Sequence, residues 1–420
     1  MRTAQSGRWL VRHANLVDGT GSPARPDHSV LVDGSTIAWV GPTAHEPEAT
    51  VDRVVDGSGH TLLPGLVNSH VHVCNDGAPD LFAQVRDDSI PVATMRGARS
   101  AQQALHAGTT TVRDCGAANG VALELARAID SGLVEGARVR AAGRVITMTG
   151  GHGHFMGRQA DGVDAVRHAV RLELQAGAHF IKAMATGGVL TPGVRPTQTA
   201  LLPEELATVV QEAHNAGRRV ATHAIGREGI RNALVAGVDS VEHGFHLDEE
   251  LFELAVARGT YLVPTLLAVS GIATEGTEGG APAWMVEKAQ LEVERSQEMF
   301  RAAVGSGMKI AAGTDAGTPF NDHDALHREL ALMVQIGLSP MQAVVAATSA
   351  AAELLDLGHL VGTVEPGKLA DLLVVRGDPL TDISCISDVA LVAKDGVVVH
   401  EPPTPPATAG GAPTGSGVTR

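Results

Sequence analysis

Histidines at the ends of short apolar segments are the residues of this chain best suited to chemistry. The chain has 19 histidines among its 420 residues, and imidazole is the commonest metal ligand among side chains. His70 and His72 are two apart in the segment GLVNSHVHV, and since side chains alternate across a strand, both would face the same side. This pair could hold one metal ion, although an HxH spacing alone also arises by chance in a chain so rich in histidine.

Four further residues extend this pattern to other apolar segments. His223, His243 and Asp315 lie at or near the ends of the segments RRVATHA, VDSVEHG and KIAAGTDAG. In barrels of parallel strands, catalytic groups gather where the strands end. Lys182 lies in the apolar segment FIKAM, where an unpaired amine would be costly to bury, although its amine could instead reach the barrel rim. Together these residues predict a metal site built from several strands.

The elements that must position these residues follow a regular pattern. Between about residues 65 and 358, short apolar segments alternate with helix-length segments, which is typical of parallel βα units. We predict eight strands, at 65–73, 109–116, 138–146, 179–186, 218–224, 238–244, 260–266 and 309–317. Eight such units predict an α/β fold with a closed (β/α)8 TIM barrel. The glycine-rich segment 270–282 is predicted to be either a mobile lid or a long loop.

Both ends of the chain show the short alternating pattern of antiparallel strands. The dipeptide Asp33-Gly34 separates two such runs and suits a tight hairpin. We expect the two ends to pair into one small β-sandwich domain, so that the predicted domains are a sandwich from residues 1–64 plus 359–400, a barrel at 65–358 and a tail at 401–420. The tail is rich in Pro, Gly and Thr without periodicity and is predicted to be disordered.

The composition disfavours several classes of function. The 32 basic and 47 acidic residues give a formal net charge of −15, which repels nucleic acid and anionic membrane surfaces. The three cysteines are far apart and form no CxxC pair, which predicts a reducing compartment. Because no segment has the apolar length of a signal peptide or membrane span, we expect a cytoplasmic enzyme that acts on a small molecule.

The motifs taken in order resemble those of the amidohydrolase superfamily. The matching segments are LLPGLVNSHVHV, FIKAMATGG, ATHAIG, SVEHG and GTDAG, and they cover nearly the whole chain before the tail. The segments GGHGH and IKAMATGGVLTPG resemble most the imidazolonepropionase-like branch, which contains Xaa-Pro dipeptidases (prolidases) and ochratoxin-hydrolysing amidases. The resemblance implies a binuclear metal centre on a barrel flanked by a small sheet domain.

This resemblance also implies roles for the six ligand-type residues. Lys182 would be carboxylated (N6-carboxylysine) and would bridge two divalent ions. His70, His72 and Asp315 would hold the buried ion, and the exposed ion would be held by His223 and His243. Zinc suits this set of nitrogen and oxygen ligands, and manganese or cobalt would also fit.

The expected reaction is hydrolysis of an amide bond in a small N-acyl amino acid or dipeptide-like substrate, by a metal-bridging hydroxide that attacks the carbonyl. Asp315 would carry the proton to the leaving nitrogen, or would be a ligand only. Dipeptidase-type relatives usually carry Tyr after the strand's His-Ala, whereas this chain has Ile225, an apolar wall. His152, flanked by glycines, is therefore predicted to be the second donor to the carbonyl oxygen, and His154 is a further substrate-side candidate.

Two more residues and three other functions remain open from the sequence. Arg195 could pair with a substrate carboxylate or lie on the surface, and His246 could line the pocket or cap the next helix. The same site could instead hydrolyse a urea, a carbamate or a cyclic amide of the imidazolone type. Deaminases of this fold carry Glu where this chain has Gly226, and single-metal branches lack the lysine. A catalytically inactive binding protein is opposed by the presence of all six ligands. Related barrels are often homo-oligomers, which we expect here.

Overall fold

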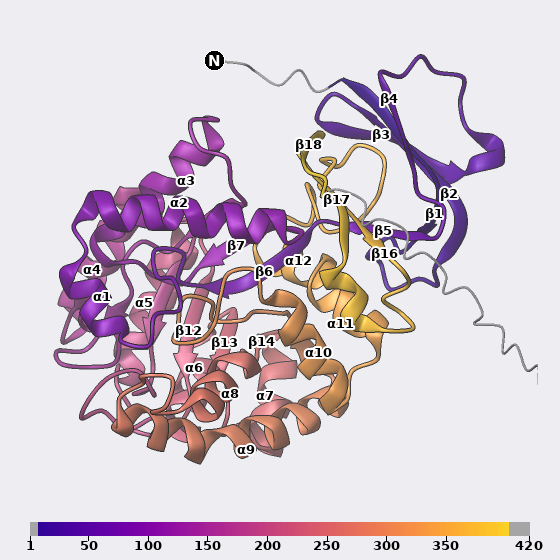
Figure 1. Ribbon diagram of the computed structural model, residues 1–420. Coiled ribbons are helices and arrows are strands. Elements are labelled where there is room, and N and C mark those ends of the chain that lie inside the picture. Colours follow the sequence, from indigo (N-terminus) through magenta and orange to yellow (C-terminus); the bar gives the residue numbers. More distant parts are fainter. Residues whose placement is uncertain (1–6, 403–420) are drawn as a thin grey trace, which may run out of the picture.

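The computed structural model describes residues 7–402 (Figure 1). Strands from both ends of the chain form one eight-stranded sheet, in the order β18-β17-β16-β5-β1-β2-β3 with β4 beside β1. Its strands are β1 (Arg8–Leu16), β2 (Arg25–Asp33), β3 (Thr36–Pro42), β4 (Arg53–Asp56), β5 (His60–Pro64), β16 (Leu372–Arg376), β17 (Val389–Lys394) and β18 (Val397–His400). The turn between β2 and β3 contains Gly34 with φ of +62°, as the predicted hairpin requires.

The two ends of the chain meet where β5 pairs with β16. These strands are antiparallel and fully in register, from Pro64 opposite Leu372 to His60 opposite Arg376. A hydrophobic cluster separate from the rest of the core packs within this sheet and includes Trp9, Ile37, Leu62, Leu372 and Leu391. The Trp9 indole also donates a buried hydrogen bond of 2.8 Å to the Gly396 carbonyl. Neither end could bury this cluster without the other.

The remaining strands are parallel and alternate with helices. Each of the eight predicted segments contains a strand, shorter than predicted: β6 (Leu66–Val71), β7 (Thr109–Asp114), β8 (Arg138–Ala141), β11 (Ile181–Met184), β12 (Val220–Ala224), β13 (Ser240–His243), β14 (Tyr261–Val263) and β15 (Lys309–Ile310). Two short strands, β9 (Ile146–Thr147) and β10 (Arg158–Gln159), are added. They form sheets in the orders β6-β7-β8 and β10-β9-β11-β12-β13-β14-β15.

Backbone hydrogen bonds join these two sheets at both sides. The Asp315 amide donates to the His70 carbonyl over 2.8 Å, and the His72 amide donates to the Ala316 carbonyl over 2.7 Å. These bonds tie the chain that follows β15 to β6. On the other side, the His179 amide donates to the Ala141 carbonyl of β8 over 2.9 Å. The eight parallel strands are therefore linked in sequence order, and the last returns to the first.

Helices cover the outside of the parallel strands (Figure 1). They are α1 (Leu81–Asp87), α2 (Ile90–His106), α3 (Val121–Asp130), α4 (Val163–Ala176), α5 (Pro203–Asn215), α6 (Arg227–Ala236), α7 (Glu249–Arg258), α8 (Leu266–Glu275), α9 (Ala283–Ser306), α10 (Leu326–Ile336), α11 (Pro340–Ala346) and α12 (Ser349–Leu354), with short 3₁₀ turns at Thr43–His45, Ala118–Gly120 and Ile383–Ser387. Helices α4, α6 and α7 each end on a glycine in the left-handed conformation, which satisfies the last carbonyls before the next strand.

The predicted loop at 270–282 is wrong for its first half. Helix α8 continues to Glu275, because Val269 and Ile272 bury apolar side chains and the buried Glu329 carboxylate accepts hydrogen bonds from the Leu266 and Leu267 amides at the helix start. The loop was predicted from the glycine-rich composition of this segment, which gives no information about a cap supplied by a residue as distant as Glu329.

Two other expectations concern the ends of the chain and the membrane. Of the tail predicted to be disordered, residues 403–420 lie outside the described residues, and 401–402 belong to no helix or strand. Within residues 7–402, none of the helices combines the length and the apolar character needed to cross a bilayer.

Candidate metal centre

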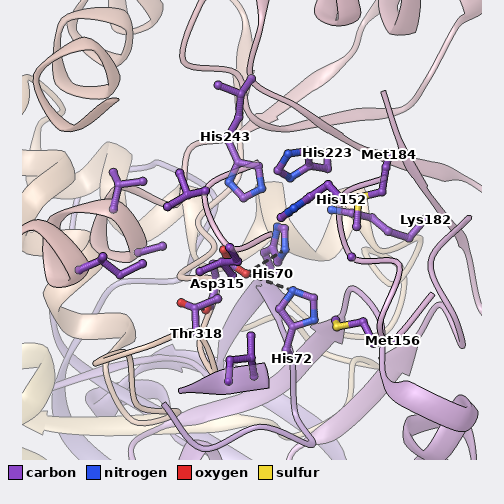
Figure 2. Close-up of a pocket in the computed structure, with 18 of the residues that line it drawn as sticks. His70, His72, His152, Met156, Lys182, Met184, His223, His243, Asp315 and Thr318 are labelled. Atoms are coloured by element: carbon purple, nitrogen blue, oxygen red, sulfur yellow. Dashed lines mark hydrogen bonds and ion pairs between the residues drawn. The ribbon is translucent and has the colours of Figure 1, made fainter. Parts of the chain in front are cut away.

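One cavity at the C-terminal ends of the parallel strands collects all six predicted ligands. Its lining includes His70, His72, Lys182, His223, His243 and Asp315. Figure 2 shows these side chains gathered around one space, with His152 beside them. The four histidines lie within one residue of the C-terminal end of β6, β12 or β13, whereas Lys182 lies within β11 and Asp315 follows β15 by five residues.

Three of the side chains already have ligand geometry. The Nε2 atoms of His70 and His72 lie 3.2 Å and 3.3 Å from Asp315 Oδ1. One potential ligand atom from each of the three residues lies within 4.8 Å of the other two. Asp315 has a φ of +61°, a conformation unfavourable for a residue with a side chain. The backbone bond from Asp315 to His70 holds it there, so the fold imposes this arrangement.

Each ligand-type histidine has one ring nitrogen occupied by a protein partner. The pairs are His70 Nδ1 with Glu242 at 2.8 Å, His72 Nδ1 with the Gly116 carbonyl at 2.8 Å, His223 Nε2 with the Gly187 carbonyl at 2.7 Å and His243 Nδ1 with Thr265 Oγ1 at 2.7 Å. Such contacts fix the orientation of the ring and leave its second nitrogen available for a metal.

Glu242 is the most heavily supported of these partners. It is fully buried, and while one oxygen contacts His70, the other accepts hydrogen bonds from Arg113 at 2.8 Å and from Ser240 at 2.5 Å. Arg113 in turn is only 3% exposed. This buried ion pair holds the carboxylate in place, so the position of His70 is set by side chains from β7 and β13.

The protonation states suit metal binding. Burial lowers the pKa of His70, His223 and His243 well below the usual value, so these rings are neutral, as ligands must be. For His72, burial lowers the pKa but the contact with Asp315 outweighs it and raises the pKa. Burial raises the pKa of Asp315, yet His70, His72 and Lys182 together lower it to about 2, so the carboxylate is ionised.

Lys182 and Asp315 each have a buried atom without a partner. Lys182 is 1% exposed, and neither its Nζ atom nor Asp315 Oδ1 has a hydrogen-bond partner. Leaving an amine unpaired in the interior costs several kcal/mol. The His223 and His243 rings lie near it, with centroids 4.6 Å apart. Neutral imidazoles, an ionised carboxylate and an orphaned amine together fit divalent metal ions.

His152 lies against this group of residues. It is 7% exposed, its Nδ1 is 2.8 Å from Thr191 Oγ1, and its ring centroid is 4.4 Å from that of His223. A Cβ atom at Gly188 would overlap the His152 ring. The glycine pair after β11 is therefore needed for the ring to reach the cavity.

Comparisons with known proteins agree with this site. The model of the amidohydrolase family matches residues 61–400, which is most of the chain. The chain belongs to the amidohydrolase family. It is 31% identical over 408 residues to ochratoxinase from Aspergillus niger, covering 89% of this chain and 82% of that protein. This match and the motifs confirm the predicted branch, and the amidohydrolase is accordingly a hydrolase that acts on carbon–nitrogen bonds.

Two solved structures resemble this amidohydrolase closely. An Xaa-Pro dipeptidase with bound methionine superposes with a TM-score of 0.86 at 33% identity, covering 93% of this chain and 99% of the other. A prolidase complexed with N-methylphosphonate-L-proline superposes with a TM-score of 0.87 at 30% identity, covering 94% of this chain and 100% of the other. The similarity therefore extends over both the sheet domain and the parallel strands.

The predicted substrate contacts divide into two groups. His152 and Ile225 line the cavity of the amidohydrolase, whereas His154, Arg195 and His246 do not. Arg195 is exposed, His154 Nδ1 contacts the Gly151 carbonyl at 3.0 Å, and His246 contacts Glu292 of α9 at 3.1 Å. These three side chains therefore do not line the cavity.

Sequence reasoning missed the residues that support the ligands. Glu242 adjoins His243, and a carboxylate inside an apolar strand was the signal available. Lys288 gave no signal, since its role depends on tertiary structure: from α9 it donates to the carbonyls of Thr191 at 2.7 Å and Val194 at 2.5 Å. It thereby ties the loop that carries Thr191 to a distant helix.

We expect Glu242→Gln to weaken metal binding by about 10–100-fold, the usual effect of losing a partner that orients a metal ligand. An amide has one acceptor oxygen and could not accept from both His70 and Arg113, and Arg113 would be left without its counter-ion. Metal content after dialysis against a series of chelator concentrations measures this. Glu253→Gln on the exposed face of α7 is the control, and equal metal retention in both variants would contradict the assignment.

Proposed function

We propose that the protein is a binuclear metal-dependent amidohydrolase that cleaves the amide bond of a small N-acyl amino acid or dipeptide-like substrate. The observation that carries the proposal is a pair of buried atoms that make no hydrogen bond, Lys182 Nζ and Asp315 Oδ1, among histidines whose rings are already oriented. Two divalent ions, with zinc the best fit and manganese or cobalt possible, would complete these contacts.

The ligands would divide between the two ions. His70, His72 and Asp315 would hold one ion, since their donor atoms already form a group. His223 and His243 would hold the other. Lys182 would bridge the two as N6-carboxylysine, because a carbamate supplies two anionic oxygens where a free ammonium would add positive charge to the site.

The protein's own residues would orient the substrate and move the proton. When bound, the metal ions would polarise the carbonyl and lower the pKa of water. Asp315, whose Oδ1 is turned toward the two histidines, would take the proton of the attacking water on its other oxygen and deliver it to the leaving nitrogen. The pKa of about 2 keeps this carboxylate ionised at neutral pH, so that it holds no proton before the reaction.

His152 would stabilise the carbonyl oxygen as charge develops on it. Thr191 Oγ1 accepts a hydrogen bond from the Gly153 amide at 3.2 Å, so its own proton is free to point at His152 Nδ1. The ring then carries its proton on Nε2 and donates it into the cavity. The Nε2–H group of His152 would thus take the place of the hydroxyl of the tyrosine that dipeptidase-type relatives usually have at the position of Ile225.

The relatives and the cavity walls support different substrates. The names of the similar proteins, an ochratoxinase, an Xaa-Pro dipeptidase and a prolidase, favour amino-acyl compounds. Among residues 7–402, however, Lys182 is the one Lys or Arg that lines the cavity. The walls are otherwise mainly apolar: Leu81, Phe155, Met156, Met184, Val189, Leu190, Ile225, Phe245, Ala268, Val269 and Ile272. This lining favours, as a second candidate, an uncharged urea or carbamate.

We further propose that the parallel strands form a closed (β/α)8 barrel at 65–358 and that residues 1–64 with 359–400 form a β-sandwich beside it. The backbone bonds from Asp315 to His70 and from His179 to Ala141 support closure, and the separate hydrophobic cluster around Trp9 supports a second domain.

The cell compartment and the assembly are also proposals. Three free cysteines, Cys74, Cys115 and Cys385, favour the cytoplasm. Exposed apolar side chains on α2, with Ile90 at 56% and Met95 at 75%, favour a homo-oligomer in which this helix is covered.

Lys182→Ala should strip or loosen the metal and lower turnover by at least about 10²-fold, because the change removes a direct ligand rather than a residue that orients one. Metal analysis and turnover measure this together, and short carboxylic acids should restore part of the activity by replacing the lost oxygens. Lys309→Ala at the exposed start of β15 is the control. Full activity in Lys182→Ala would mean that the lysine is not a ligand.

His152→Asn should lower kcat by about 10²–10³-fold, the usual effect of losing one donor to a developing oxyanion, while the metal content stays at the wild-type level. Parallel loss of metal and activity would instead give His152 a structural role.

Turnover of N-acyl amino acids and Xaa-Pro dipeptides with apolar side chains is the expected result of a substrate screen on the metal-loaded enzyme. Each N-acyl amino acid is paired with its uncharged carboxamide, so that the effect of the carboxylate is measured directly. Hydrolysis confined to aryl carbamates and ureas would establish the second candidate and remove the amino-acyl one.

A further inference from the structure

A second cavity lies at the opposite ends of the parallel strands, where β11 and β12 begin, and is also lined by Arg140 of β8. Its lining comprises Arg113, Arg140, His179, Phe180, Gly217, Arg218, Arg219, Leu354, Leu355 and Asp356. It shares no lining residue with the metal-site cavity. Whatever binds in it therefore binds separately from the substrate.

Three guanidinium groups around this cavity form no close ion pair. In residues 7–402, no carboxylate oxygen comes within 4.0 Å of a side-chain nitrogen of Arg140, Arg218 or Arg219, although most arginines of this acidic chain are paired. The Nε atom of Arg140 is also buried without a hydrogen-bond partner. Asp356 is the one carboxylate in the lining.

The other polar groups of the lining are already satisfied. Arg113 donates to Glu242 at 2.8 Å and to Ser240 at 3.1 Å, so its charge is cancelled. His179 Nδ1 accepts a hydrogen bond from the Ala141 amide at 3.0 Å, and burial together with nearby arginines lowers its pKa to about 4, so the ring is neutral. Among the lining residues, the three unpaired arginines and Asp356 sum to a net charge near +2, while Asp130 and Glu353 act on Arg140 and Arg219 from outside the lining.

Holding these charges together is unfavourable without an anion. Burial lowers the pKa of Arg140, an effect that Arg218 strengthens and that Asp130 and Asp356 partly offset, yet a guanidinium remains protonated at neutral pH. An oxyanion would satisfy the free donors through charge-assisted and bidentate hydrogen bonds, which guanidinium geometry suits. A phosphate group carries between −1.5 and −2 charges at pH 7 and matches the charge of the cavity.

We propose that this cavity is an oxyanion-binding site for a phosphate group, held by Arg140, Arg218 and Arg219. The source of the group is either inorganic phosphate or a small phosphate monoester. Acetate, with one charge and two oxygens, should bind more weakly than either.

The test is titration of the metal-loaded protein with inorganic phosphate by calorimetry at low ionic strength, since salt screens exposed charges. The double variant Arg218→Gln/Arg219→Gln should bind phosphate at least about 10-fold more weakly, as expected for losing hydrogen bonds to charged groups. Arg295→Gln/Arg301→Gln removes the same charge from exposed positions of α9 and should bind like the wild type. Equal thermal midpoints in all three proteins show that they are folded.

Two outcomes would overturn the proposal. The wild type could fail to bind phosphate at millimolar concentration, or the Arg218→Gln/Arg219→Gln variant could bind as tightly as the wild type, which would place the anion elsewhere, such as at the metal ions. Titration with glycerol 3-phosphate distinguishes the sources: tighter binding than inorganic phosphate identifies a monoester site, and weaker binding identifies a site for the free ion.

Discussion

Burial of ionisable groups inside parallel strands is the constraint on which the rest of the structure depends. Arg113, Lys182, Glu242 and Asp315 are all less than a tenth exposed, and a buried charge is tolerated only when it is compensated. Arg113 and Glu242 compensate each other. Lys182 and Asp315 are left with unpartnered atoms, so the most stable form of the fold should be the one that holds metal. Metal binding and folding are then linked.

The backbone around the metal site is also in an unfavourable conformation. His243, Thr265 and Asp315 all have positive φ, which is unfavourable for residues with side chains. Two are proposed ligands, and Thr265 holds the ring of His243. Thr265 itself directly precedes α8, whose first amides are bound by Glu329. Local strain at a functional site persists when the surrounding structure holds it in place, and here a carboxylate from α10 helps to do so.

The sequence predicted the parts of this molecule that depend on local pattern. The eight parallel strands follow from short apolar segments bounded by glycine stops, and the gathering of the six ligand-type residues in one cavity follows from polar residues in and after those strands. The partners that orient those ligands depend on tertiary packing: Glu242 contacts a histidine of β6, and Lys288 binds a loop about a hundred residues earlier. The helix at 270–275 was missed for the same reason, because its cap comes from Glu329. Side-chain direction was equally inaccessible, so Arg195 and His246 were weighed as cavity residues.

The pairing of β5 with β16 has a consequence for how cells make this protein. At typical translation speeds of about 5–20 residues per second, the first strands wait on the order of 15–60 s on the ribosome before the partner strand is synthesised. Throughout that time one edge of β5 has no neighbour, and an open strand edge invites pairing with other chains. Nascent chains of this protein should therefore need shielding by a chaperone, and messages broken before the codon for Leu372 should yield insoluble products.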